Sequence, residues 1–374
     1  MKHRIDGVQK GRMVWVKQMK RADRLADSED ALTAVIEFLT AFVLFLIILT
    51  AFFSLAGLQL GSNHPKSDQL DDYALQGMQR LTGDSGWYVP IDEWGDRDIA
   101  NGTADWHHYN ATKLLEGSVQ PGIAGDFGRL DEERLNAISN ITQDQFIRGL
   151  GLPDWSSINL TIRIVESLNS SRVDVLLFQD GASRDAAANS AVAHRLMVLN
   201  NETVEIIFEV HDAGRTPANL IITEFMAEPE IGFPEWVELE NRDGFAANLT
   251  GWGLGRSSGG GLHTLIGDGA LAGGNILLCS GKPSLQENQG AEIVLDLGQS
   301  TILGRGAVNG LNMYSDTLSL TWTFPGKAQT HTTMEVAWDD DWEIESNISL
   351  EWNGGYASNS SNWDRSNGGT PGSI

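Results

Sequence analysis

Residues 38–58 form an uncharged apolar stretch, FLTAFVLFLIILTAFFSLAGL, the only one of its kind in the 374-residue chain. A helix of this length measures about 31 Å at about 1.5 Å per residue, which matches a hydrocarbon core of about 30 Å. We therefore predict that the chain crosses a membrane once, within residues 31–60. A cleaved secretory signal is the alternative, but the stretch exceeds the roughly 7–15 apolar residues of such signals, and residues 58–62 lack a small-residue cleavage pattern.

The charges that flank this stretch predict its orientation. Residues 1–30 contain eight basic side chains, whereas the first fifteen residues after the apolar stretch contain only Lys66. Because basic segments stay on the cytoplasmic side, we expect residues 1–30 to be cytoplasmic and residues 61–374 to lie outside the cell. The sequence thus predicts a single-pass protein of the cell membrane.

The region after the apolar stretch is strongly acidic. Residues 61–374 carry 18 basic and 44 acidic residues, a net charge of −26. Such a surface repels nucleic-acid phosphates and anionic lipid, so we expect no nucleic-acid partner. Hydration of the surface in a high-salt setting is another explanation for the acidic excess.

This region also holds all nine N-x-S/T acceptor sequences of the chain, as expected for a segment outside the cell. We predict glycosylation at Asn101, Asn110, Asn140, Asn159, Asn169, Asn201, Asn248, Asn347 and Asn359. The chain contains a single cysteine, Cys279, which excludes a disulfide within the chain. Because Cys279 lies in an apolar, strand-like run, we expect a buried thiol rather than a nucleophile.

The length of the outer region predicts two domains. A polar joint with glycine and proline at residues 211–217 separates them, so we expect one domain over 61–215 and another over 216–374. Apolar spacing in the first domain predicts a helix over 68–81 and short helices over 131–139 and 142–150. Alternating runs then predict about four antiparallel strands, the last two forming a hairpin that turns at Asn200 and Asn201.

The first domain and the stretch before it combine a basic leader, an apolar helix with Glu37 near its start, the segment from Gly128 to Ser139 and a closing hairpin. In this combination, residues 28–212 resemble archaeal type IV pilin-like membrane proteins. In pilins the matching glutamate pairs with the processed N-terminal amine of a neighbouring subunit. Here that cleavage would fall between Leu32 and Thr33, with no glycine or alanine before the bond. The alternative is that the Glu37 carboxylate reaches the inner headgroups.

From residue 219 onward, eight or so short strands separated by Gly, Asn and Ser turns predict a β-sandwich or barrel rather than an α/β enzyme. Six pieces of this region follow one another in a fixed order: residues 222–225, 234–241, 248–254, 271–274, 315–320, and the end of the chain from Ser349 through Trp363 to Gly372. In these pieces and their order, residues 217–374 resemble the lamin-tail domain, an immunoglobulin-like sandwich. The fold class implied is mainly β with an N-terminal transmembrane helix, a pilin-like α+β domain and an immunoglobulin-like sandwich.

One detail of the second domain needs an explanation. Trp236 and Leu239 cannot share a face of a regular strand, so a bulge or a partly buried glutamate must reconcile them.

Several motifs suggest chemistry but lack its context. Ser257 lies in a G-x-S-x-G pattern that runs into glycines with no helix, and residues 267–272 match a dinucleotide fingerprint without a βαβ unit. His107 and His108, with Asp105 nearby, have metal-binding side chains, but neighbours on an extended segment point apart. We predict no catalytic residues and no bound cofactor other than calcium.

The calcium candidates are Asp339, Asp341 and Glu343, because hard cations prefer clustered carboxylates, although the EF-hand spacing is absent. A solvated acidic loop is the alternative. Aromatic side chains in residues 83–125 either bind sugars or a protein partner, or fill the core of the first domain. They are Trp87, Tyr88, Trp94, Trp106 and Tyr109.

Together these features predict a non-enzymatic, membrane-anchored surface protein. It would display a lamin-tail-like domain for adhesion, binding of a protein or glycan partner, or organisation of the cell envelope. Two alternatives stay open: a minor pilin-like subunit of a surface filament, and an accessory module of an extracellular hydrolase system.

Overall fold

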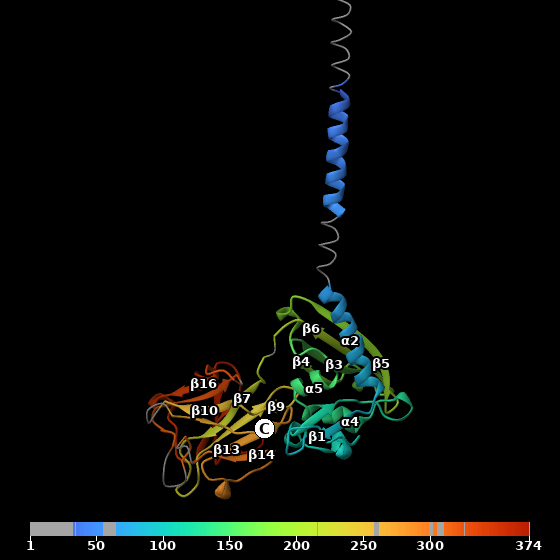
Figure 1. Ribbon diagram of the computed structural model, residues 1–374. Helices are drawn as coiled ribbons and strands as arrows, with labels where there is room; N and C mark the ends of the chain where they lie inside the picture. Colours follow the sequence, from blue (N-terminus) through green and yellow to red (C-terminus); the bar gives the residue numbers. More distant parts are fainter. Residues whose placement is uncertain are drawn as a thin grey trace, which may run out of the picture. The chain divides into compact units, whose positions relative to one another are not determined.

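The computed structural model describes residues 33, 35–54, 65–214, 216–257, 262–298, 302–304, 310–324 and 326–373. Residues 1–66 and 67–374 are two separate units. In the first unit, Val35–Ser54 is a helix long and apolar enough to cross a membrane, with its side chains exposed along its whole length. Glu37 lies on this helix. The second unit is mainly β (Figure 1).

The first half of the second unit packs a long helix on an antiparallel sheet (Figure 1). The helix is α2, Pro65–Gly83, and the sheet has the order β4 (Leu176–Gly181), β3 (Ser157–Glu166), β6 (Glu202–His211), β5 (Ser190–Leu199). The helix buries Leu70, Ala74, Met78 and Leu81, which follow the three-to-four spacing of the sequence, against the alternating apolar residues of the strands. The predicted helix and four-stranded sheet are therefore confirmed.

The hairpin of this sheet turns where the sequence predicts. Asn200 and Asn201 connect β5 to β6 with φ angles of +47° and +72°. Two consecutive residues with positive φ match the right-handed twist of the strands, and asparagine tolerates this conformation. Asn159 on β3 lies opposite Gly181 on one side and Glu209 on the other, so β3 is a central strand.

Smaller elements cover one end of this half. They are β1 (Trp87–Pro90), β2 (Gly117–Gln120), α3 (Ala111–Leu115), α4 (Glu132–Asn136) and α5 (Gln143–Gly149). Thr142 and Gln145 form a capping box at the start of α5, and the Asp131 side chain accepts the Arg134 N–H at the start of α4. Both predicted short helices are present, with α4 followed by a 3-10 turn over Ala137–Asn140. The β1–β2 pair was not predicted.

The second half consists of two larger sheets and a small one (Figure 1). The six-stranded sheet has the order β14 (Ile293–Asp296), β13 (Ile276–Ser280), β8 (Trp236–Asn241), β7 (Leu220–Met226), β17 (Ile348–Trp352), β18 (Trp363–Asn367). The four-stranded sheet has the order β11 (Leu262–Leu265), β10 (Trp252–Arg256), β15 (Asp316–Thr323), β16 (Thr330–Trp338). The small sheet pairs β9 (Ala247–Asn248) with β12 (Ala270–Leu271).

The two larger sheets share one apolar core, as in a sandwich. Side chains from the six-stranded sheet, such as Leu239 and Leu277, lie in the same buried cluster as Leu254 and Leu320 from the four-stranded sheet. Cys279 is fully buried in this cluster, as expected. Nearly all described strands are antiparallel, but β13 and β14 run parallel.

The two halves also contact each other within this unit. Phe245 comes from the second half, yet its ring lies 5.1 Å from those of both Phe146 and Phe178 in the first half. The Phe245 N–H donates to Asp180 Oδ2 over 2.7 Å, and Ala246 pairs with Thr142 in an isolated bridge. The boundary near residue 215 remains a prediction.

Candidate functional site

A cleft of about 210 Å³ opens beside the six-stranded sheet and brings together distant parts of the second half. One wall is the loop between β7 and β8, which exposes Ile231 by 95% and Phe233 by 46%. A second wall contains Leu285, exposed by 42%. The carboxylates of Glu230 and Glu287 also line this cleft and are exposed. The cleft thus combines exposed apolar side chains with two exposed carboxylates.

The floor of the cleft depends on β8, whose two faces are both buried. Val237 and Leu239 point into the sandwich core, whereas Trp236 joins a separate small cluster with Met226 and Leu278. Glu238 lies on the same face as Trp236 and is 1% exposed. The puzzle of Trp236 and Leu239 is therefore resolved by a buried glutamate on a strand that is apolar on both sides.

Two buried carboxylates attach the C-terminal segment to this face. Glu238 Oε2 accepts the Gly372 N–H over 2.8 Å, and Glu224 accepts the Ser349 hydroxyl over 2.5 Å and the Thr370 N–H over 3.1 Å. Gly368 and Pro371 of the same segment line the cleft. Burial raises the pKa of Glu238 to about 7 and also raises the pKa of Glu224.

A third buried carboxylate, Glu235, holds the backbone on the other side of β8. It accepts the N–H groups of Gly304, Gly310 and Leu311 over 2.9, 2.8 and 2.6 Å. These donors come from irregular backbone that has no strand partner, so the carboxylate supplies the acceptors a sheet would otherwise provide. Burial raises the pKa of Glu235 to about 7 despite these three donors.

The predicted calcium candidates lie on a short 3-10 turn over Asp340–Trp342 and its flanks. The Asp339 carboxylate accepts the Asp341 N–H over 3.2 Å, and Asp339, Asp341 and Glu343 are all exposed. Among the described residues, these three do not form a group whose ligand atoms converge. The structure thus brings no calcium cage together here.

A different group does converge, in the first half. The ligand atoms of Asp105, His107 and His108 all lie within 4.8 Å of one another. The sequence argument against these histidines assumed an extended segment, and that assumption is wrong. Trp106–His108 is a turn of 3-10 helix, in which the imidazole rings of His107 and His108 lie 4.1 Å apart.

The electrostatics of this histidine pair have identifiable causes. The His107 side chain is only 6% exposed, and burial lowers the pKa of its imidazole, assisted by the nearby positive charges of Arg134 and His108. Glu133 Oε2 lies 4.0 Å from Nε2 of His107 and 3.8 Å from Nε2 of His108. The neutral form of the His107 imidazole is thereby favoured, and a carboxylate faces both rings.

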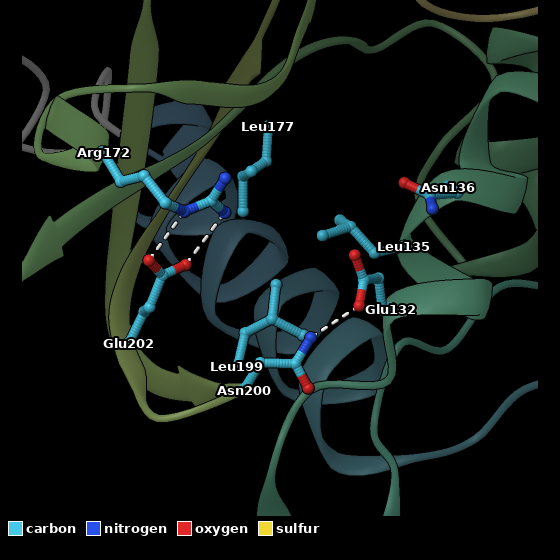
Figure 2. Close-up of a pocket in the computed structure, with 8 residues that line it drawn as sticks. All are labelled: Glu132, Leu135, Asn136, Arg172, Leu177, Leu199, Asn200 and Glu202. Carbon is cyan, nitrogen blue, oxygen red and sulfur yellow. Dashed lines mark hydrogen bonds and ion pairs between the residues drawn. The ribbon is translucent and has the colours of Figure 1, made fainter. Parts of the chain in front are cut away.

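Another cavity, of about 270 Å³, lies between α4 and the β5–β6 hairpin (Figure 2). Arg172 lines it, but its guanidinium donates from Nε and Nη2 to the two Glu202 oxygens over 2.7 and 2.9 Å. Asn200 Nδ2 donates to Glu132 across the cavity. Because its cation is already in a bidentate ion pair, this cavity offers no unpaired charge to an anionic ligand.

The hydrolase-like motif does not form a catalytic arrangement in the described part of the chain. Ser257 Oγ donates directly to Asp316 Oδ1 over 3.2 Å, whereas His263 Nε2 lies 2.7 Å from Thr321 Oγ1. A catalytic triad needs the histidine between the serine and the acid. The glycines at 267 and 269 lie in a turn before β12, with φ angles of +124° and +125°.

The structure separates the predicted aromatic and glycosylation residues by exposure. Tyr88 and Trp106 are core residues, whereas Trp94 is 86% exposed and Trp87 44%. Six acceptor asparagines are exposed: Asn101, Asn110, Asn169, Asn201, Asn248 and Asn359. Asn140, Asn159 and Asn347 are partly buried.

Family models, curated proteins and solved structures were compared with the chain, and none matches it. The lamin-tail and pilin-like resemblances therefore stay predictions. The cleft beside β8 was not predicted from the sequence. The nearest signal was the apolar, proline-flanked loop of residues 229–234, which is followed by a strand without regular alternation.

Proposed function

We propose that this protein is a non-catalytic, single-pass membrane protein that displays its β-rich unit outside the cell and binds a protein partner there. The observation that carries the binding role is the cleft beside β8. Phe233 and Leu285 line the cleft and are 46% and 42% exposed. Exposed apolar side chains that gather at one cleft mark a surface that a partner can bury.

The size and charge of the cleft suggest the kind of partner. Its volume of about 210 Å³ is below the roughly 300–1,000 Å³ of sites for drug-sized ligands. A cleft of this size suits one or two anchoring side chains of a partner protein, with the exposed apolar residues packing around them. Glu230 and Glu287 favour a partner with basic side chains next to its apolar anchor.

Membrane anchorage is supported by the Val35–Ser54 helix and by the eight basic residues before it. Under the positive-inside rule these residues stay cytoplasmic and the acidic region after the helix faces outward. Adhesion and organisation of the envelope are both uses of such a displayed binding surface.

Two experiments test this proposal, one of the membrane topology and one of the partner contact. Protease added to intact cells should digest residues 67–374, and a protected region would refute outward display. A photo-reactive amino acid at position 233 of the full-length chain should then give a discrete crosslinked product with a partner. The same amino acid at Tyr356, which is 84% exposed, serves as the matched control and should give none.

The chemistry of the contact can be tested separately. Adding Leu285→Asp, or the charge reversal Glu230→Lys with Glu287→Lys, should abolish the crosslink from position 233. A crosslink that survives both changes would place the partner contact elsewhere and contradict the proposed cleft.

A further inference from the structure

The turn that carries Asp105, His107 and His108 is rigidly attached to the core. Trp106 is fully buried between them, and its indole Nε1 donates to the Ser85 carbonyl over 2.9 Å. The His108 N–H donates to the Asp105 carbonyl over 3.1 Å. A buried anchor between the polar side chains fixes their backbone in advance, which is what a preorganised ligand site requires.

The three ligand atoms are close enough to share one ion. Atoms that lie within 4.8 Å of one another have a common point no more than ~2.8 Å from each, the side divided by the square root of three. Zinc binds histidine nitrogen and carboxylate oxygen at about 2.0–2.2 Å. Side-chain adjustments of less than about 1 Å would therefore complete the first coordination shell.

His107 provides an independent observation that points to a ligand. Its side chain is more than nine-tenths buried. Its Nδ1 atom is buried too, and it has no hydrogen-bond partner among the described residues. Buried polar atoms are nearly always paired, so an orphan of this kind calls for an explanation. A metal ion bound by this imidazole would take up the lone pair that the protein leaves unused.

The neighbouring charges fit such a site. Glu133 faces Nε2 of both histidines and can orient the rings or complete the coordination, as carboxylates do in metal–histidine sites. Arg134 opposes a cation, but its Nη1 donates to the carbonyls of Ser85 and Ala104 over 2.6 and 2.9 Å. Its guanidinium also lies 3.6 Å from Asp131, which offsets part of its charge.

We infer that Asp105, His107 and His108, with Glu133 beside them, form a binding site for a divalent transition-metal ion of the zinc type. Two imidazoles and carboxylates are ligands that such ions prefer, whereas calcium and magnesium prefer oxygen alone. The site lies on the first half of the second unit and is independent of the proposed partner-binding cleft.

The experiment uses the full-length chain in detergent micelles, purified through a tag without histidine and treated with a chelator. Zn²⁺ is then titrated in competition with a chromophoric chelator. We expect one Zn²⁺ per chain, with no competition from Ca²⁺ or Mg²⁺. Asp105→Asn and His108→Ala should each weaken binding at least about tenfold. Both residues are exposed, so these variants keep the fold.

His194→Ala is the matched control, because His194 is an exposed histidine paired with a glutamate on β5. It should bind Zn²⁺ as the parent chain does. Substitution with Co²⁺ should give visible absorption bands in the parent and control but not in the Asp105→Asn, His108→Ala double variant. Absence of Zn²⁺ binding in the parent, or undiminished binding in the double variant, would overturn the site.

Discussion

The replacement Glu235→Gln isolates the free-energy cost of a buried charge. Glu235 is 1% exposed, and its two oxygens accept three backbone N–H groups from irregular loops. Glutamine has the same shape but no charge, and it replaces one of the accepting oxygens by a donor. We expect the variant to lose about 1–3 kcal/mol at low pH, because an N–H group is left unpaired.

The larger consequence is a change in pH dependence. Burial raises the pKa of Glu235 from 4.5 to about 7, so the native state holds this proton more tightly than the unfolded chain. The contribution of this group to stability is therefore complete below pH 4.5 and is lost as the pH rises through 7. A shift of 2.5 units corresponds to about 3.4 kcal/mol, of which about 2.5 kcal/mol falls between pH 5 and pH 8.

The assay is urea unfolding of the full-length chain in detergent, followed by tryptophan fluorescence at several pH values from 5 to 8. Other buried carboxylates such as Glu238 titrate in both proteins, so the informative quantity is the difference in unfolding free energy between parent and variant. That difference should move by about 2.5 kcal/mol in favour of the variant as the pH rises. Glu335→Gln, an exposed carboxylate on β16, serves as control. A parent–variant difference that stays constant from pH 5 to pH 8 would refute the buried-charge explanation.

Substitutions at three further positions test the packing by the same unfolding assay. Gly77→Ala should destabilise the protein by about 1–2 kcal/mol, because the added Cβ would clash with the Phe208 ring. The better helix propensity of alanine offsets only part of that cost. An unchanged free energy of unfolding would mean that α2 and the sheet are less tightly packed than described. Asn201→Ala should cost about 1–2 kcal/mol at a φ of +72°, whereas Asn201→Gly should cost nothing, and equal effects would exclude the turn geometry. Phe245→Ala should destabilise the protein by about 3–5 kcal/mol, because it leaves a cavity beside the rings of Phe146 and Phe178. A near-neutral result would show that the two halves do not share this contact.

Local patterns in the sequence were enough to predict the regular elements. The spacing of Leu70, Ala74 and Leu81 predicts α2, and the paired asparagines predict the β5–β6 turn, because each depends only on residues close in the chain. Short strands after residue 219 were likewise predicted, and β7, β8, β13, β15 and β17 are among those present. The strands β9 and β12 were not predicted, because two residues are too few to show an alternating pattern of their own.

The candidate sites were harder to predict because each depends on a buried anchor outside the site. Asp105 and the two histidines were not predicted to bind a metal together, because neighbouring residues on an extended segment point apart. The structure gives that segment a 3-10 turn, since Trp106 enters the core and donates to Ser85. Nothing adjacent in the sequence identifies Trp106 as buried and Trp94 as exposed, so the convergence could not be predicted.

The cleft beside β8 shows the same dependence on hidden anchors. Its walls are loops with little regular structure, and the C-terminal wall is attached through Glu224 and Glu238. A backbone N–H that binds a buried carboxylate is held by a stronger contact than a neutral acceptor provides. Ionisation of these buried carboxylates destabilises the folded protein, yet the ionised form binds the loop amides most strongly. The buried acidic residues of the six-stranded sheet therefore trade stability for a defined position of the apolar side chains that the proposed partner would contact.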